Sequence, residues 1–125
     1  MKKENKTTKK DFELFKKECR KWIKIFSLLR WRVEYEHSDR YPDFRACCSS
    51  DLNNGLALIS LTIDWKEDLV TKDRVKICAF HEVQELFLTR LASIAGTRFV
   101  TKAEVDEATH EIIRTLENVV YPKLK

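Results

Sequence analysis

Three stretches of the chain place apolar residues at steps of three and four, the spacing of one face of an α-helix. The first begins near Asp11 and carries Lys and Arg on its opposite face. The second covers residues 73–95, is apolar nearly all the way round and should end near Gly96. The third begins at Thr101, where Glu104 completes the pattern of a capping box. We therefore predict a first amphipathic helix, a buried central helix and a last helix.

Strand patterns lie between the first and second predicted helices. Apolar and charged residues alternate over residues 31–36, as in a half-buried strand, and residues 44–50 and 56–63 can form two more strands. The Asn54-Gly55 pair between these two is a strong signal for a tight hairpin, because both residue types tolerate positive φ. The predicted fold class is α+β: an N-terminal helix, a small three-stranded, mainly antiparallel sheet, and two C-terminal helices.

Charge is concentrated at the start of the chain. The 125 residues carry a net charge of +4, and residues 1–10 hold five Lys and one Glu, so the remaining 115 residues carry 19 basic and 19 acidic side chains. A short basic end of this kind is usually a solubilising tail. We predict a disordered basic tail over residues 1–10 and a single domain over residues 11–125, and we do not expect nucleic-acid binding.

The sequence shows neither a membrane-spanning segment nor the features of a signal peptide. No apolar run approaches the roughly 20 residues that a membrane-spanning helix needs, and no apolar section follows the basic N-terminus as it would in a signal peptide. We therefore expect a cytoplasmic protein without a membrane anchor. Its cysteines form no CxxC pair, so we expect small buried thiols and no disulfide framework. Cys78 precedes His81 by three residues on the same helical face and could touch a metal there.

An ionisable cluster interrupts the central apolar helix. His81 and Glu85 are four residues apart and share a face, while Glu82 flanks them. Charged groups in apolar surroundings must be paired, bound to a metal or exposed in a cleft, because burying an unpaired charge is costly. On the last helix, His110 and Asp106 lie along one flank of the apolar stripe. Without a metal, the two helices would form a hydrogen-bonded polar pair.

Two strings, HEVQE over residues 81–85 and DEATHEIIRTLENV over residues 106–119, give the chain a family resemblance. The order of elements resembles that of zincin metallopeptidases, in which a helix bearing HExxH lies beside a small sheet. More narrowly, residues 12–120 are similar to short zincin-like proteins encoded by tailed phages and prophages, which share HEVxE and an HxIIRxLENV-like ending. Here Glu85 stands where HExxH has its second His, and the following helix offers His110.

The resemblance implies a metal site with named roles. His81, Glu85 and His110 would bind Zn²⁺ and leave the fourth position to water, while Glu82 would act as general base. The carboxylate of Glu85 weakens the preference for zinc, so Mn²⁺, Fe²⁺ or a site without metal are alternatives. In the second shell, the side chains that could orient the site or replace a ligand are Asp106, Glu107 and Cys78.

The resemblance also implies a function and a partner. The first expectation is a zinc-dependent peptidase acting on a protein or peptide, which would add as a strand to the edge of the sheet. By analogy with zincins, residues 56–63 would form that edge. The alternative is a catalytically inactive zincin-fold protein that binds a host protein, such as a defence protein. A weaker third option, nucleic-acid binding through residues 1–10 and the basic first helix, predicts steep salt dependence of binding. The oligomeric state cannot be read from the sequence.

Overall fold

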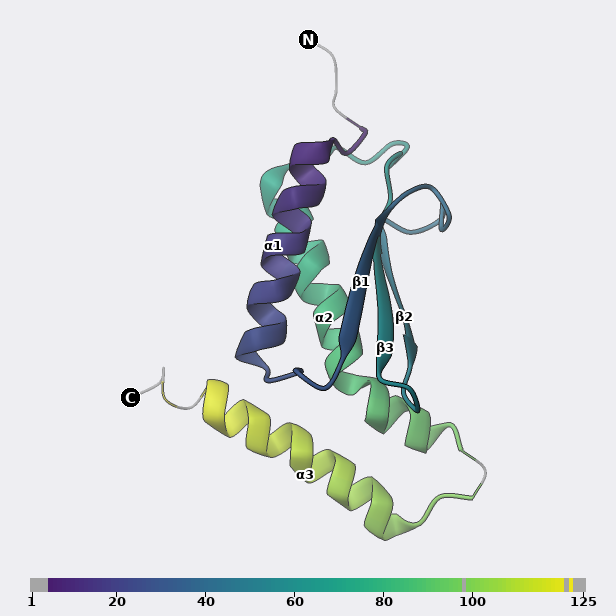
Figure 1. Cartoon of the computed structure of the whole chain (residues 1–125), viewed down its shortest axis with the longest axis vertical. Helices are drawn as coiled ribbons and strands as arrows, with labels where there is room; N and C mark the ends of the chain where they lie inside the picture. The colour runs from purple at the N-terminus through teal and green to yellow at the C-terminus, as the bar shows by residue number, and fades with distance from the viewer. Residues whose placement is uncertain (1–4, 98, 121, 123–125) are drawn as a thin grey trace.

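Helices and strands follow one another in the predicted order. The structure is a computed structural model and describes residues 5–97, 99–120 and 122 (Figure 1). The α+β fold class is confirmed. The predicted domain over residues 11–125 therefore has residues 98, 121 and 123–125 outside the described part. The elements are α1 (Lys9–Ile25), β1 (Arg32–His37), β2 (Ala46–Asp51), β3 (Leu56–Leu61), α2 (Lys72–Ala95) and α3 (Lys102–Val119).

The sheet has the strand order β1-β3-β2. β2 pairs antiparallel with β3, from Ala46 opposite Leu61 to Asp51 opposite Leu56, so the predicted hairpin is confirmed. β1 pairs parallel with β3, so the sheet is mixed where the sequence favoured mainly antiparallel pairing. The expectation that residues 56–63 form the edge is wrong. β3 is the central strand, because it pairs with β1 on one side and with β2 on the other, and its Ile59 and Leu61 are fully buried.

The hairpin turn uses only one of its two expected positive φ angles. Gly55 has φ +67°, whereas Asn54 keeps a negative φ and instead donates from its backbone N and Nδ2 to the Asp51 carboxylate, at 3.3 and 2.7 Å. A Cβ at position 55 would lie 3.2 Å from the carbonyl oxygen of Arg30. Glycine is therefore required here both for its backbone conformation and for space.

Helices α1 and α2 run side by side along one face of the sheet (Figure 1). The core between them and the sheet includes Phe15, Val75 and Val83, all fully buried. The prediction that the central helix is buried all round is wrong: Ile77 is 66% exposed and Leu88 is 41% exposed. α2 packs against α1 and the sheet on one side, and its other side faces solvent along much of its length. This open side is where an ionisable cluster can reach water.

The predicted basic tail is partly ordered. The backbone N of Thr7 donates to the carbonyl oxygen of Ile63 at 2.8 Å, and Trp65 N donates to the carbonyl oxygen of Asn5 at 2.9 Å. Thr7 is 5% exposed, and α1 already begins at Lys9 behind its N-cap Thr8. The expectation of a disordered tail is therefore wrong for residues 5–10, because this segment pairs with the chain that follows β3. Residues 1–4 lie outside the described residues.

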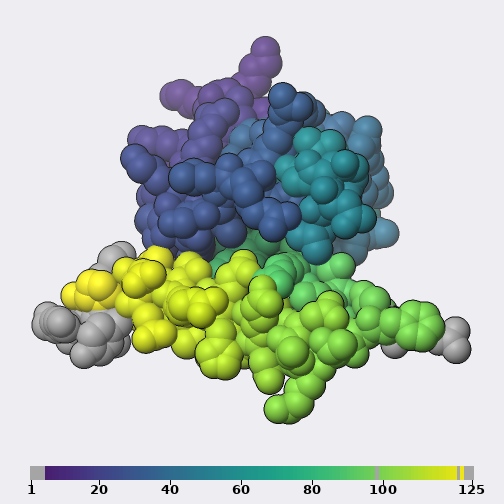
Figure 2. All heavy atoms as spheres, turned by 60° about the horizontal axis from the view of Figure 1, so that its bottom comes forward, coloured from purple at the N-terminus to yellow at the C-terminus, as the bar shows by residue number. Residues whose placement is uncertain are grey.

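Helix α3 crosses the end of the molecule and forms its lower edge in Figures 1 and 2. It begins with the predicted capping box between Thr101 and Glu104. Of the residues of α3, all of which are described, Ala108 alone is buried. Two ion pairs from Arg90 of α2 to Glu107 and Glu111 fix α3 against the C-terminal half of α2. Within the described ranges, we find no helix with the length and apolar character of a membrane span.

A candidate metal site on helix α2

The structure brings together three of the predicted site residues. His81, Glu82 and Glu85 each offer one ligand atom, and these atoms all lie within 4.8 Å of one another. The local cause is the helix itself, which places residues 81, 82 and 85 within little more than one turn. Thr71 starts this helix by accepting a hydrogen bond from Arg74 N at 3.1 Å. Among the described residues, these three form the group with metal-ligand geometry.

Two members of the group are open to solvent. The side chains of His81 and Glu85 are 66% and 54% exposed, and His81 Nε2 lies 3.9 Å from Glu85 Oε1. That separation leaves both atoms free to turn toward a shared cation, because it is longer than a hydrogen bond. Exposure also means that water or a substrate can approach the pair. The sequence left three possibilities for this cluster (pairing, metal binding or exposure in a cleft), and the structure shows that these two side chains reach solvent.

Glu82 differs from its two neighbours because it is buried. It is 4% exposed, and its Oε1 has no hydrogen-bond partner among the described residues. Burial, together with a hydrogen bond and the negative charge of Glu85, raises its pKa to about 9. Without a cation the carboxyl group is therefore protonated at neutral pH. A positive ion beside it would reverse the effect of Glu85 and favour the carboxylate.

The sheet side of α2 explains why Glu82 is desolvated. Glu82 lies on the same side of the helix as Ala79, Val83 and Leu86, which are buried against α1 and the sheet. Glu82 therefore occupies a position where an apolar side chain would be expected. Burying its carboxyl group there costs solvation free energy that an apolar residue would not lose. A buried polar atom without a partner is rare in folded proteins, and Glu82 Oε1 is one of three such side-chain atoms among the described residues.

The residues predicted on the last helix are placed elsewhere. His110 is exposed on α3 and is not part of the α2 group. Its Nδ1 donates to the carbonyl oxygen of Asp106 at 2.8 Å, so the lone pair of the neutral ring is on Nε2. Glu107 pairs with Arg90 of α2. Arg90 comes nine residues after His81, which places it about 13 Å further along the axis of α2. Asp106 pairs with Lys102 at 3.5 Å.

The cysteines behave as small apolar side chains. Cys19 is fully buried, and its thiol donates to the carbonyl oxygen of Ala79 at 3.9 Å. The predicted absence of a disulfide agrees with four free thiols. Burial raises the pKa of Cys78 to about 11, so its thiol is protonated at neutral pH. Because the thiolate is the form that binds metals, Cys78 contributes to the packing beside the cluster in this state.

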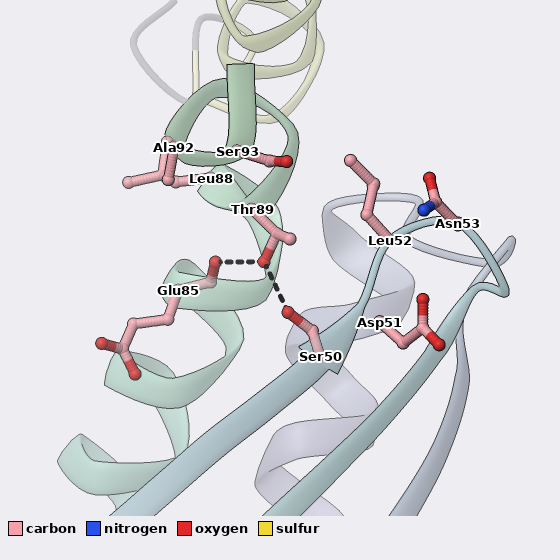
Figure 3. Close-up of a pocket in the computed structure, with 9 residues that line it drawn as sticks. All are labelled: Ser50, Asp51, Leu52, Asn53, Glu85, Leu88, Thr89, Ala92 and Ser93. Carbon is pink, nitrogen blue, oxygen red and sulfur yellow. Dashed lines mark hydrogen bonds between the residues drawn. The ribbon is translucent and has the colours of Figure 1, made fainter. Parts of the chain in front are cut away.

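A pocket beside the cluster was not foreseen from the sequence. It has a volume of about 720 Å³ and lies between α2 and the C-terminal end of β2 (Figure 3). Ser50 of β2 and Thr89 of α2 meet at its floor, with their hydroxyl oxygens 3.4 Å apart. Glu85 belongs both to this pocket and to the ligand group. This pocket forms only because β2 packs beside α2, and no local sequence motif predicts the contact between Ser50 and Thr89.

Comparisons with models of protein families, with curated proteins and with solved structures found no match to this chain. Fold and site therefore define the class. The protein is an α+β protein whose longest helix presents an imidazole and two carboxyl groups within reach of one cation.

Proposed function

We propose that His81 and Glu85 hold a divalent metal ion next to Glu82, and that the protein is a zincin-like metallopeptidase of phage type that works in the cytoplasm of a host cell. One observation carries the proposal: the buried, unpartnered Oε1 of Glu82 lies beside two exposed ligand groups. A desolvated carboxyl oxygen with no protein partner has a physical use next to a cation. The resemblance of the HEVQE and HEIIRTLENV strings supports the same reading.

The donor set suits a transition metal. Imidazole nitrogen favours Zn²⁺ and Fe²⁺, while a second or third carboxylate oxygen makes Mn²⁺ competitive. When bound, such an ion supplies a water molecule whose pKa falls toward about 7. Glu82 would accept the proton of that water and deliver it to the leaving amine. Burial suits this role, because it keeps Glu82 in one place and makes its proton affinity sensitive to the charge beside it.

The edge of the sheet offers a place for a peptide. Thr62 N donates to the carbonyl oxygen of Arg45 at 2.9 Å, and in antiparallel pairing every second residue bonds to the partner strand. The backbone groups of Ala46, Cys48 and Ser50 therefore point to the free side of β2, where no strand pairs within the described chain. An extended peptide added to this edge would lie along α2 and close to the cluster.

Metal content tests the proposal directly. Tag-free wild type should contain close to one metal ion per chain by elemental mass spectrometry. His81→Ala should remove the metal, because it deletes the imidazole of the α2 group. His110→Ala should keep most of it, because His110 lies outside that group. Glu82→Gln should also keep the metal but abolish peptide hydrolysis, since the amide cannot take a proton.

Each result has a distinct meaning. Loss of metal in Glu82→Gln would make Glu82 a ligand and contradict its role as base. Loss in His110→Ala would show that α3 moves over the cluster, as the zincin resemblance implies. A metal-free wild type after refolding with Zn²⁺, Mn²⁺ or Fe²⁺ would contradict the proposal as a whole.

A second function is supported by the position of His110. With one imidazole in the α2 group, the ligand set is smaller than that of a catalytic zinc site, which uses three protein ligands. The same fold could then act by binding alone, and the edge strand would hold a segment of a host protein without cleaving it. A metal-free wild type that captures a peptide on β2 would favour this binding protein over the peptidase.

A further inference from the structure

The turn between β2 and β3 contains the single Asn-Gly pair of the chain, Asn54-Gly55. An asparagine amide is chemically labile, because the backbone nitrogen of the next residue can attack its side-chain carbonyl carbon. A side chain on that next residue hinders the attack, whereas glycine has no Cβ and leaves its nitrogen unshielded. The pair therefore joins a labile amide to the least hindered backbone nucleophile.

The fold leaves both reacting groups available. Asn54 is exposed and Gly55 is half-buried. The backbone N–H of Gly55 has no hydrogen-bond partner in the described ranges, although that of Asn54 donates to Asp51 Oδ1 at 3.3 Å. By contrast, the nitrogen that follows Asn118 belongs to α3, where the hydrogen bonds of the helix hold the backbone. The turn thus lacks the protection that a helix gives an asparagine.

We propose that Asn54 is a site of spontaneous deamidation in the folded protein, and that the reaction loosens the hairpin. The Gly55 nitrogen gives its proton to water and bonds to the side-chain carbonyl carbon of Asn54. The bond from that carbon to Nδ2 breaks, and Nδ2 takes up a proton and leaves as ammonia. Water then opens the succinimide: cleavage at the side-chain carbonyl restores the ordinary backbone with an aspartate, and cleavage at the main-chain carbonyl gives isoaspartate. No oxidant or reductant takes part.

Aspartate at position 54 brings two negative charges together. In the intact turn, Asn54 Nδ2 donates to Asp51 Oδ2 at 2.7 Å. This bond is the main reason why the pKa of the Asp51 carboxyl lies below its usual value. After deamidation, a carboxylate oxygen stands in place of the donor. The contact that fixed the turn becomes a repulsion between like charges.

Isoaspartate disturbs a second set of contacts, because its main chain runs through Cβ and is one atom longer. The segment before β1 is bonded to this turn: Arg32 N donates to the carbonyl oxygen of Gly55 at 2.7 Å, and Arg30 Nη2 donates to that of Leu52 at 3.1 Å. A longer backbone between positions 54 and 55 shifts the carbonyl groups on which both bonds depend. The turn also borders the pocket between β2 and α2 (Figure 3), so the reaction changes the end of the proposed peptide-binding edge.

Peptide mapping of aged protein tests the reaction. Tag-free protein kept native at 37 °C and pH 7.4 for several weeks should exchange the NH2 of Asn54 for OH, as read by mass spectrometry, and isoaspartyl methyltransferase should label part of the product. Conversion should be roughly tenfold faster at Asn54 than at the other asparagines of the chain, Asn5, Asn53 and Asn118. The rate should rise with pH, because the attacking nitrogen must lose its proton. Asn54→Gln should remove the reaction from the turn, since glutamine would have to close a larger ring.

A matched pair of variants tests the structural consequence. Asn54→Asp reproduces the ionic product with an ordinary backbone, and should lower the melting temperature at pH 7 by several degrees. Asn53→Asp makes the same charge change in the same exposed turn, but the side chain of Asn53 makes no hydrogen bond to Asp51. Its melting temperature should fall by less.

Three results would contradict these expectations. Conversion at Asn54 no faster than at the other three asparagines would overturn the inference. Conversion in concentrated urea but not in the native protein would overturn it too, because the fold would then protect the amide. Equal melting temperatures of Asn54→Asp and Asn53→Asp would overturn the loosening of the hairpin. Neither a metal nor a peptide enters these measurements, so the inference and the proposed function fail separately.

Discussion

At the scale of single residues, Glu82 is the most informative side chain. It combines burial, an oxygen without a partner and a neighbouring carboxylate, and each of these disfavours its charged form. His81 and Glu85 do not share this condition, because both reach solvent. The sequence could identify all three as a group, but it could not say which one the fold desolvates.

Glu82 should make the metal-free protein less stable as pH rises. Its pKa is about 9 in the folded chain against a usual value of 4.5, so the folded state keeps a proton that the unfolded state loses between these values. The free energy of unfolding therefore falls as pH rises from about 4.5 to 9. Glu82→Gln is neutral throughout, so its melting temperature in chelator should match that of wild type near pH 4.5 and exceed it by several degrees at pH 8.

An exposed glutamate provides the control for this pH profile. Glu117→Gln on α3 removes the same charge without a buried environment, so its melting temperature should follow that of wild type across the range. Parallel curves for Glu82→Gln and wild type between pH 5 and 9 would show that Glu82 is already ionised in the folded state.

At the scale of elements, the hairpin turn and the helix ends are set by local chemistry. The Asn54-Gly55 pair, the Thr101 capping box and the end of α2 at Gly96 were all readable in the sequence and are present in the structure. The partner of each strand was not readable. Parallel pairing of β1 with β3 depends on contacts between segments far apart in the chain, which leave no local pattern.

The two glycines should respond in opposite ways to alanine. Gly55→Ala forces a Cβ into a positive φ and toward the carbonyl oxygen of Arg30, and should cost about 1–2 kcal/mol. Gly96→Ala is the matched control, because Gly96 has a helical φ of −86° and an ordinary 3.5 Å contact. It should be neutral or slightly stabilising. Urea unfolding of both variants measures the difference, and equal losses would contradict the assigned turn.

At the scale of the whole molecule, the N-terminal segment ties α1 to the C-terminal ends of the parallel strands β1 and β3. Thr7 donates through Oγ1 to the carbonyl oxygen of Thr62 at 2.9 Å and contacts His37 Nε2 at 2.7 Å. Phe12 of α1 stacks on the same imidazole, with ring centroids 4.9 Å apart. The start of the chain thus holds α1, β1 and the segment after β3 together.

Deletion of residues 1–8 should therefore destabilise the fold. The truncation removes the Thr8 cap and the bonds from Asn5 and Thr7, so the melting temperature should fall by several degrees. A shorter deletion of residues 1–4 removes Lys2 and Lys3 but none of these contacts, and should leave the melting temperature unchanged. Scanning fluorimetry of both truncations distinguishes a structural segment from a tail whose only property is charge.

The sequence by itself determined the elements, because periodicity, caps and turn residues act over a few positions along the chain. It also determined the group of His81, Glu82 and Glu85, because one helical turn brings these residues together whatever surrounds them. Tertiary structure alone decided which strand is central, which side of α2 is open and that His110 lies outside the cluster. It also made the pocket between β2 and α2, since Ser50 and Thr89 are 39 residues apart and meet only when β2 packs on α2. Burial and long-range pairing are properties of the assembled chain, and for that reason the chemistry of Glu82 could be read only from the fold.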